Sequence, residues 1–455
     1  MAPELQHESH TSRLTRFSHW MAGLVPDAIT ASVILTLIIS GLALGLGNSF
    51  ERVMDAYHQG LWMLLPFTMQ MTLIIVLSSA LASTPFLRRA IGGLARLPRT
   101  RNQVIVAAFL AAGVASYLYW GLGYALGPIV AIYYASEAER KGIDVDFPFL
   151  LGVTTAAQAL WQYGPSSSGP LLVASTGHFL QSVIGVMPLS KTIWSPAAII
   201  HEIVYSVLAM AAACWLMPTK CRPISQFPAS CALAKPATAA GEAESATTFS
   251  DRLERGFLVP LVMCTMLAVW LWYHFVLKGL SLDINSLNAT LLLLTFLFHR
   301  SVLRFVRAIR EGVGSSWAVI VLYHLYAGVA GMVQLTSVGA KAADWAASIS
   351  TASTFPLITA ITGTVFACFI PSSGGQWTVQ GFVTVKTAMA VGVSVPRGML
   401  ALGVGDHMGN FLTPFWYVVI GGMARIDFRN FFGYGLVFSA IWFVVGILVF
   451  TFAPC

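Results

Sequence analysis

Two short polar phrases interrupt long apolar stretches of this chain, one in each half. Residues 165–169 read PSSSG and residues 371–375 read PSSGG. In a bilayer every backbone N–H and C=O must find a partner, so such breaks are tolerated only where they are buried or line a cavity. A matching pair of breaks, one in each half, therefore points to the binding site of a membrane transporter.

The second phrase continues into further polar residues, and we interpret 371–381 as the tip of a hairpin. Serine hydroxyls, the amides of Gln376 and Gln380, and unwound carbonyls offer neutral oxygen ligands to a small cation. Helix N-termini after the glycines offer N–H groups to a carboxylate. A tight turn filled with small residues is the alternative, but it explains Gln376, Trp377 and Gln380 less well. The expected substrate-binding residues come from both phrases and from a glycine-rich turn near 120–123: Ser166, Ser167, Ser168, Ser372, Ser373, Gly374, Gly375, Gln376, Trp377, Gln380, Trp120 and Gly121.

Asp406 is the only acidic residue that we place inside an apolar span. A charge at membrane depth is costly, so an intramembrane acid is a functional candidate by default. Asp406 stands in the phrase GDHMGNFLTP at 405–414, which we interpret as the second-half match to the broken span at 158–170. It could bind sodium, carry a proton or pair with His407; alternatively, the span is displaced and Asp406 lies at the membrane interface. The ion-coupling candidates are Asp406, His407, Asn410, Thr413 and Gly164, with a Na⁺ position near Ser372, Ser373, Asn410 and Thr413.

Other polar residues within the spans have simpler interpretations. His324 lies beside Tyr323, and a lone histidine in a span is more often a hydrogen-bonded packing residue than a coupling group. Gln70 either lines the hairpin cleft or joins two helices. An intramembrane serine hydrolase would need a general base within reach of a serine. The downstream His178 lies near a span end, so that pairing is unsupported.

The composition is that of a membrane protein with several spans. Of 455 residues, 56% are hydrophobic and 10% are charged, against roughly 25% charged in soluble domains. Mean hydropathy is +0.74. The net charge of +7 indicates basic cytoplasmic loops rather than a nucleic-acid surface. The six scattered cysteines suggest neither a disulfide framework nor a zinc site, and the N-terminus does not read as a signal peptide.

Two apolar stretches, 104–135 and 355–391, are too long for one span of about 20 residues and too short for two spans with a loop. We expect each to form a re-entrant hairpin. Arginines gather at 88–101 and at 299–310, and both segments should be cytoplasmic. This placement puts the N-terminus in the cytoplasm and the C-terminus in the periplasm.

The halves of the chain match as an inverted repeat. A cytoplasmic N-terminal segment (1–24) precedes the first repeat (25–217), with a hairpin at about 104–135 and a broken helix at about 147–175. A flexible cytoplasmic linker (218–255) follows. The region 256–455 holds an additional span and the second repeat, with a hairpin at about 355–391 and a broken helix at about 398–423. The alternative is that any two bundles of apolar helices look alike.

At these residues the chain resembles the short-chain fatty acid transporter family, the acetoacetate and butyrate permeases of bacteria, within a broad ion-transporter superfamily. The likeness spans about 14–452 and is carried by LPFTMQM at 65–71, ALAS at 80–83, PSSGGQW at 371–377, QG at 380–381 and PFW at 414–416. It implies an all-α polytopic fold with a scaffold domain, a transport domain with two opposed hairpins, and elevator-type movement, often in a homodimer. The two arginine-rich arms would then be interfacial helices. Ser373 stands where the family has Gly, and Thr413 where it has a polar amide, so the substrate could differ from butyrate or acetoacetate.

We therefore expect a secondary active transporter of small monocarboxylates in the bacterial inner membrane. It should work by alternating access, coupled to Na⁺ or H⁺, without another cofactor and without enzymatic activity. Its expected partners are the monocarboxylate, the lipid bilayer and a second copy of the chain, and no nucleic acid. A transporter of another small organic anion, such as a dicarboxylate, and an anion channel remain the alternatives.

Overall fold

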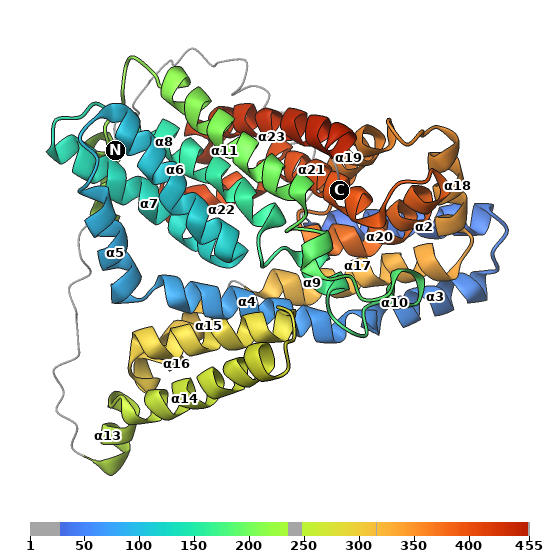
Figure 1. The fold of residues 1–455 in the computed structure, drawn as a ribbon, viewed down its shortest axis with the longest axis horizontal. Helices are drawn as coiled ribbons and strands as arrows, with labels where there is room; N and C mark the ends of the chain where they lie inside the picture. Colours follow the sequence, from blue (N-terminus) through green and yellow to red (C-terminus); the bar gives the residue numbers. More distant parts are fainter. Residues whose placement is uncertain (1–27, 235–247, 315, 454–455) are drawn as a thin grey trace, which may run out of the picture.

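The computed structural model describes residues 28–234, 248–314 and 316–453, which form helices and no strand (Figure 1). This confirms the all-α prediction. Within these residues, seven helical segments are long and apolar enough to cross a membrane. They are Ala28–Gly45, Phe50–Ala82, Arg101–Leu118, Pro196–Leu216, Leu258–Leu277, Trp317–Leu335 and Phe432–Phe452.

One group of helices, which we call the platform, is built around a long bent pair. α3 (Phe50–Met63) and α4 (Leu65–Ala82) meet at Leu64, just before Pro66. α2 (Ala28–Gly45) and α17 (Trp317–Leu335) pack on α3. The approach of α3 to α17 is close because Gly60 faces Gly331, and a methyl group on either would overlap the opposite backbone.

The rest of the platform lies along α4 and α17. In Figure 1, α14 (Leu258–Trp272), α15 (Ile284–His299) and α16 (Val302–Val313) lie on the side of α4 away from α6 and α8. The remaining pieces are α13 (Phe249–Arg255), the π-helical turn η4 (Tyr273–Leu277) and α18 (Val338–Ser348). α5 (Pro85–Ala95) leads from α4 to the second group and packs against α7.

The second group, which we call the bundle, contains the helices of both predicted hairpins. Its first-half members are α6 (Arg101–Leu118), α7 (Trp120–Arg140), α8 (Phe147–Ala157), η1 (Gln158–Tyr163), α9 (Ser168–Val173) and α11 (Pro196–Leu216). Its second-half members are α19 (Phe355–Ala367), α20 (Ser373–Ala390), α21 (Val395–Leu412), α22 (Phe415–Ala424) and α23 (Phe432–Phe452). Short segments connect them: α10 (Gln181–Ile184), η2 (Leu189–Lys191), η3 (Ile224–Gln226), α12 (Pro228–Ala234) and η5 (Phe428–Asn430). α20 packs against α17 and α18 as well as α21, so it lies where the platform meets the bundle.

Each predicted hairpin is a pair of helices with a short connection. α6 and α7 pack along each other and are joined through Tyr119, a single extended residue. α19 and α20 are joined by 368–372. The expected unwound tip at 371–381 was wrong beyond Ser372: Ser372 caps α20 by accepting the Gly375 N–H over 3.4 Å, so Gly374 to Gln380 are helical.

The two broken helices also differ from one another. In the first half, η1 ends at Tyr163, Gly164 is extended, and α9 begins at Ser168, as the sequence predicts. In the second half the expected break at 405–414 was too long. α21 continues through Asp406 to Leu412, and only Thr413 and Pro414 separate it from α22, because Pro414 lacks the N–H needed to continue the helix.

The order hairpin, broken helix, helix recurs along the chain, as α6–α7, α8–η1–α9 and α11, then as α19–α20, α21–α22 and α23. The opposed orientation of the two repeats, and their position in a membrane, remain predictions. In space each half of the sequence contributes to both the platform and the bundle.

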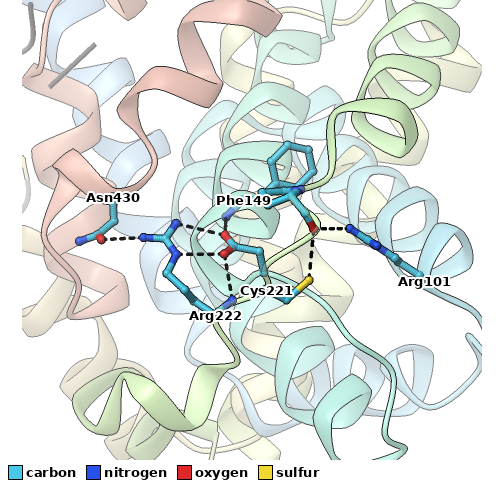
Figure 2. Close-up of polar contacts among 7 residues, drawn as sticks. Arg101, Phe149, Cys221, Arg222 and Asn430 are labelled. Carbon is cyan, nitrogen blue, oxygen red and sulfur yellow. Dashed lines mark hydrogen bonds and ion pairs between the residues drawn. The ribbon is translucent and has the colours of Figure 1, made fainter. Parts of the chain in front are cut away.

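The predicted flexible linker is ordered at its beginning. Asp146 caps α8 by accepting the Phe149 N–H, and its carboxylate forms an ion pair with Arg222 at 3.0 Å. Arg222 also donates to Asn430 between α22 and α23 (Figure 2). Arg101 donates to the Pro218 carbonyl on the other side of this cluster (Figure 2). The start of the linker thus joins both halves of the bundle, while residues 235–247 and the N-terminal segment 1–24 lie outside the described residues.

Candidate functional site

A small inner pocket lies within the bundle, where the first break meets α20 and α21. Its polar lining includes the carboxyl group of Asp406 on α21, with Gln162 on η1 and Ser373 and Gln376 on α20. Met399, Leu400, Leu402 and Gly403 supply the apolar wall, and Tyr163, Ser167, Gly169, Pro170 and Trp377 complete the lining.

A larger outer pocket lies between the bundle and α17 of the platform. Its walls are mainly aromatic: Trp120 and Tyr124 from α7, Trp161 from η1, Tyr323 from α17, and Phe415 and Trp416 from α22. Tyr124 stacks on Trp416 with ring centroids 4.3 Å apart. Ser168, Ser372, Ser373 and Asn410 add polar groups to an apolar lining that also includes Ala318, Val319, Leu322 and Pro371. Ligand pockets typically combine such an apolar wall with a few polar groups.

Ser373 lines both pockets and therefore stands between them. It begins α20, whose N-terminal N–H groups carry partial positive charge. Its hydroxyl accepts from Gln162 Nε2 over 3.3 Å. The neighbouring Ser372 hydroxyl donates to the Tyr323 hydroxyl over 3.0 Å, which ties α20 to the platform.

Asp406 is 2% exposed and is surrounded by neutral polar groups. Asn410 donates to Asp406 Oδ1 over 3.0 Å, and Ser373 and Gln162 lie beside the carboxyl group. Asp406 Oδ2 has no hydrogen-bond partner among the described residues. No Lys, Arg or His is among the residues that line either pocket in the described part of the chain. The site can thus offer oxygen ligands or a proton-accepting carboxylate, but it has no side-chain cation for a bound anion.

The structure brings most of the predicted substrate residues together. Ser167, Ser168, Ser372, Ser373, Gln376, Trp377 and Trp120 line one or both pockets. The other five lie just behind them. Ser166 accepts the Trp120 N–H over 2.8 Å, and Gln380 accepts from Gln376 over 2.8 Å. Gly121 packs against Ser78 of α4, and Gly374 and Gly375 lie against Tyr323 and Tyr326.

The predicted ion-coupling residues divide into two groups. Asp406 and Asn410 belong to the pockets. Thr413 lies behind Asn410 and donates to its carbonyl over 3.2 Å. Gly164 packs against the Tyr117 carbonyl, where a methyl group would overlap it. His407 points away from Asp406, towards Phe411 and Trp442. Of the predicted Na⁺ set, Ser372, Ser373 and Asn410 share the outer pocket, and Thr413 does not line it.

The remaining candidates have structural contacts. His324 bonds to the Ile320 carbonyl and packs edge-on against Trp62. Gln70 donates to Asn285 over 2.8 Å, so it joins α4 to α15. His178 bonds to the Gly185 carbonyl over 2.9 Å. Among the described residues, no histidine lines the pockets beside the serines. The Ser167 hydroxyl donates a hydrogen bond to the Gln162 carbonyl.

Sequence reasoning missed several lining residues: Gln162, Tyr124, Trp161, Tyr323 and Trp416. Trp161 and Gln162 stand a few residues before the PSSSG phrase, so proximity to a break could have identified them. Tyr323 gave no such signal, because its role depends on the packing of α17 against α20. The prediction that Asp406 is the only acid within a span was also wrong, since Glu202 lies within α11.

Comparison with known proteins agrees with this architecture. The family model described as short chain fatty acid transporter matches residues 9–452. The chain belongs to this family. An Escherichia coli (strain K12) protein whose name assigns it to short-chain fatty acid transport is 27% identical over 96% of this chain and 98% of its own length. A Haemophilus influenzae protein with the same name is 26% identical over 96% of this chain and 99% of its own length.

The fold also resembles a solved structure, the YdaH transporter of Alcanivorax borkumensis, whose crystal structure is described as having an unusual topology. The TM-score is 0.63, with 13% identity, over 94% of this chain and 98% of that chain. That likeness shows the fold. Together, the family and the seven long apolar helices of the described residues make this a multi-pass membrane protein of a transporter family.

Proposed function

We propose that this member of the short-chain fatty acid transporter family is a secondary active transporter that moves a small monocarboxylate, such as butyrate or acetoacetate, together with Na⁺ or H⁺. The observation that carries the proposal is the pair of pockets that meet at Ser373. The outer pocket offers an aromatic wall to a short acyl chain, and the inner pocket offers a buried carboxyl group without a basic partner.

The charges of the site support ion coupling. A substrate carboxylate near Ser373 would approach the Asp406 carboxylate with no Lys, Arg or His lining either pocket in the described residues. Two like charges about 5 Å apart repel by about 3 kcal/mol at an effective dielectric constant near 20. A Na⁺ among the site's oxygen atoms, or a proton on Asp406, removes this repulsion. The substrate anion and the cation should therefore bind together.

The shape of the outer pocket favours a monocarboxylate over a dicarboxylate. The N-terminus of α20 and the hydroxyls of Ser168, Ser372 and Ser373 suit one carboxylate. The rest of the lining is mostly apolar and aromatic, with Trp120, Tyr124, Trp161 and Trp416, so a second carboxylate there would lose hydration and find single indole N–H and phenol O–H donors instead of a second helix N-terminus.

The two groups of helices suit alternating access. The outer pocket lies between α17 of the platform and α7, α9, α20 and α22. In this proposal the platform is the scaffold and the bundle carries the site across the membrane, in an elevator-type movement. α5 and α16, which carry the two arginine-rich arms, lie along the cytoplasmic surface. The protein works in the bacterial inner membrane, with a cytoplasmic N-terminus, a periplasmic C-terminus and a second copy as its partner.

Uptake of radiolabelled butyrate into proteoliposomes tests the proposal, with a Na⁺ gradient and a H⁺ gradient imposed separately. We expect accumulation above the external concentration under one gradient, and competition by acetoacetate but not by a dicarboxylate. Electrical current that only follows the butyrate gradient, without accumulation, would instead indicate a channel. No uptake of any small carboxylate under either gradient would refute the proposal.

A further inference from the structure

A second acidic side chain lies within a helix that is long and apolar enough to cross a membrane, and it is not part of either pocket. Glu202 belongs to α11, one of the long apolar helices. The residue is half-buried, but both of its carboxyl oxygens are buried, and among the described residues no side chain forms a hydrogen bond with them. An ionised carboxylate in this setting is costly unless it is paired.

No basic side chain is available to pair with Glu202 on the helices packed around α11. These are α6, α8, η1 and α23. α8, η1 and α23 contain no Asp, Glu, Lys or Arg, and the only charged side chain of α6 is Arg101, which is bound to the Pro218 carbonyl. The titratable groups that interact with Glu202 are Tyr117 of α6 and Tyr205 of α11, and the preceding residue His201 packs against Trp442 of α23.

Glu202 lies where the first hairpin meets the first broken helix. Its carboxyl group is beside the backbone of Tyr163, the last residue before the break at 164–167. Tyr117, which also faces Glu202, supplies the carbonyl against which Gly164 packs. A charge on Glu202 therefore lies next to the segment that carries Ser166, Ser167 and Ser168.

Two buried histidines, His201 beside Glu202 in the sequence and His407 on α21, pack against the same tryptophan ring. The His201 ring packs against Trp442 at 4.2 Å between centroids, and His407 packs against the same ring at 4.9 Å. The Nδ1 atoms of both histidines are buried and without hydrogen-bond partners among the described residues.

We propose that Glu202 is a proton-binding site separate from Asp406, and that its protonation sets the conformation of the break at 164–167. The proton adds to the carboxylate from water and leaves to water, without another reactant. With the proton bound, Glu202 is neutral and the break packs against the first hairpin as observed. Without it, the unpaired charge disfavours this packing and loosens the segment that carries the three serines.

Infrared difference spectroscopy of the purified protein over a series of pH values tests the site without requiring transport. In the Asp406→Asn background, which removes the other buried carboxyl group, we expect a protonated-carboxyl C=O band that changes with pH, is lost on adding Glu202→Gln, and is retained on adding Glu311→Gln, which removes an exposed acid of α16. Glu202→Asp should shift the band, which keeps the test available if Glu202→Gln folds poorly. A band in the Asp406→Asn background that persists on adding Glu202→Gln, or one that does not change with pH, would overturn the proposal.

Hydrogen exchange measured on peptides that cover 164–167 tests the second half of the proposal. Exchange there should become faster as pH rises in the wild type, beyond the chemical effect of pH seen in exposed reference peptides. It should lose this excess in Glu202→Gln, whose amide stays neutral. Equal pH dependence in both proteins would show that Glu202 does not control the conformation of the break, whether or not the protein transports butyrate.

Discussion

Gln162 donates a hydrogen bond from Nε2 to the hydroxyl of Ser373 over 3.3 Å. Gln162 stands just before the PSSSG phrase of the first half, and Ser373 belongs to the PSSGG phrase of the second. The two interruptions therefore meet directly, and neither half can form the site alone. This contact explains why the chain carries two such phrases, about 200 residues apart by the count of their positions in the sequence.

Removing the two hydroxyls at the start of α20 should weaken substrate handling. In Ser372→Ala with Ser373→Ala, the contacts to Tyr323 and Gln162 are lost. Two hydrogen bonds of about 1 kcal/mol each predict a fall in butyrate uptake of roughly tenfold or more. Ser348→Ala, which changes an exposed serine of α18, is the matched control. Normal uptake by the double variant, at equal protein in the membrane, would move the site elsewhere.

Gly409 lets α21 approach α19, and a methyl group there would overlap the Thr364 carbonyl. Overpacking of this kind typically costs about 1–3 kcal/mol. Gly409→Ala should therefore lower the thermal unfolding midpoint of the detergent-solubilised protein. Gly422→Ala adds the same methyl group within α22 where nothing lies within 4 Å, and it should leave the midpoint unchanged or raise it slightly, because alanine favours a helix over glycine. Equal midpoints for both variants would mean that α19 and α21 are not packed as described.

Asp146 combines a helix cap with a buried ion pair, so its loss should be costly. Asp146→Ala removes the cap of α8 and leaves Arg222 unpaired. Loss of the cap costs about 1 kcal/mol, and the partly exposed Arg222 adds a moderate further cost, for a total of roughly 2–3 kcal/mol. Asp427→Ala breaks a pair with Arg429 in which both side chains are about half exposed and should cost about 0.5 kcal/mol or less. Thermal unfolding midpoints distinguish the two; similar midpoints would contradict the role of the Asp146 cluster.

The overall architecture could be predicted from sequence because its signals are local. Apolar length identified the helices, and proline with serine and glycine marked the break at 164–167. The extent of the second break was overestimated, since Gly405 and Gly409 read as helix breakers but instead serve the close packing of α21 on α19. Such a contact depends on a partner helix that no local pattern specifies.

The candidate site was predictable in part for the same reason. Ser372, Ser373 and Asp406 could be identified because polar residues are rare at membrane depth. The aromatic wall could not, because Trp120, Tyr124 and Trp416 are ordinary residues for an apolar helix and gain meaning only when α7 and α22 come together. Glu202 carried a local signal, an acid within an apolar span, that was overlooked.

In the proposed mechanism, the substrate anion and the coupling cation meet beside Asp406. The most direct test compares the wild type with Asp406→Asn in proteoliposomes, measuring gradient-driven accumulation of radiolabelled butyrate and, separately, exchange of butyrate at equal concentrations without a gradient. Asp344→Asn, in an exposed position of α18, is the control. We predict that Asp406→Asn still exchanges butyrate but no longer accumulates it under either gradient. Accumulation at the wild-type level by Asp406→Asn would contradict the account.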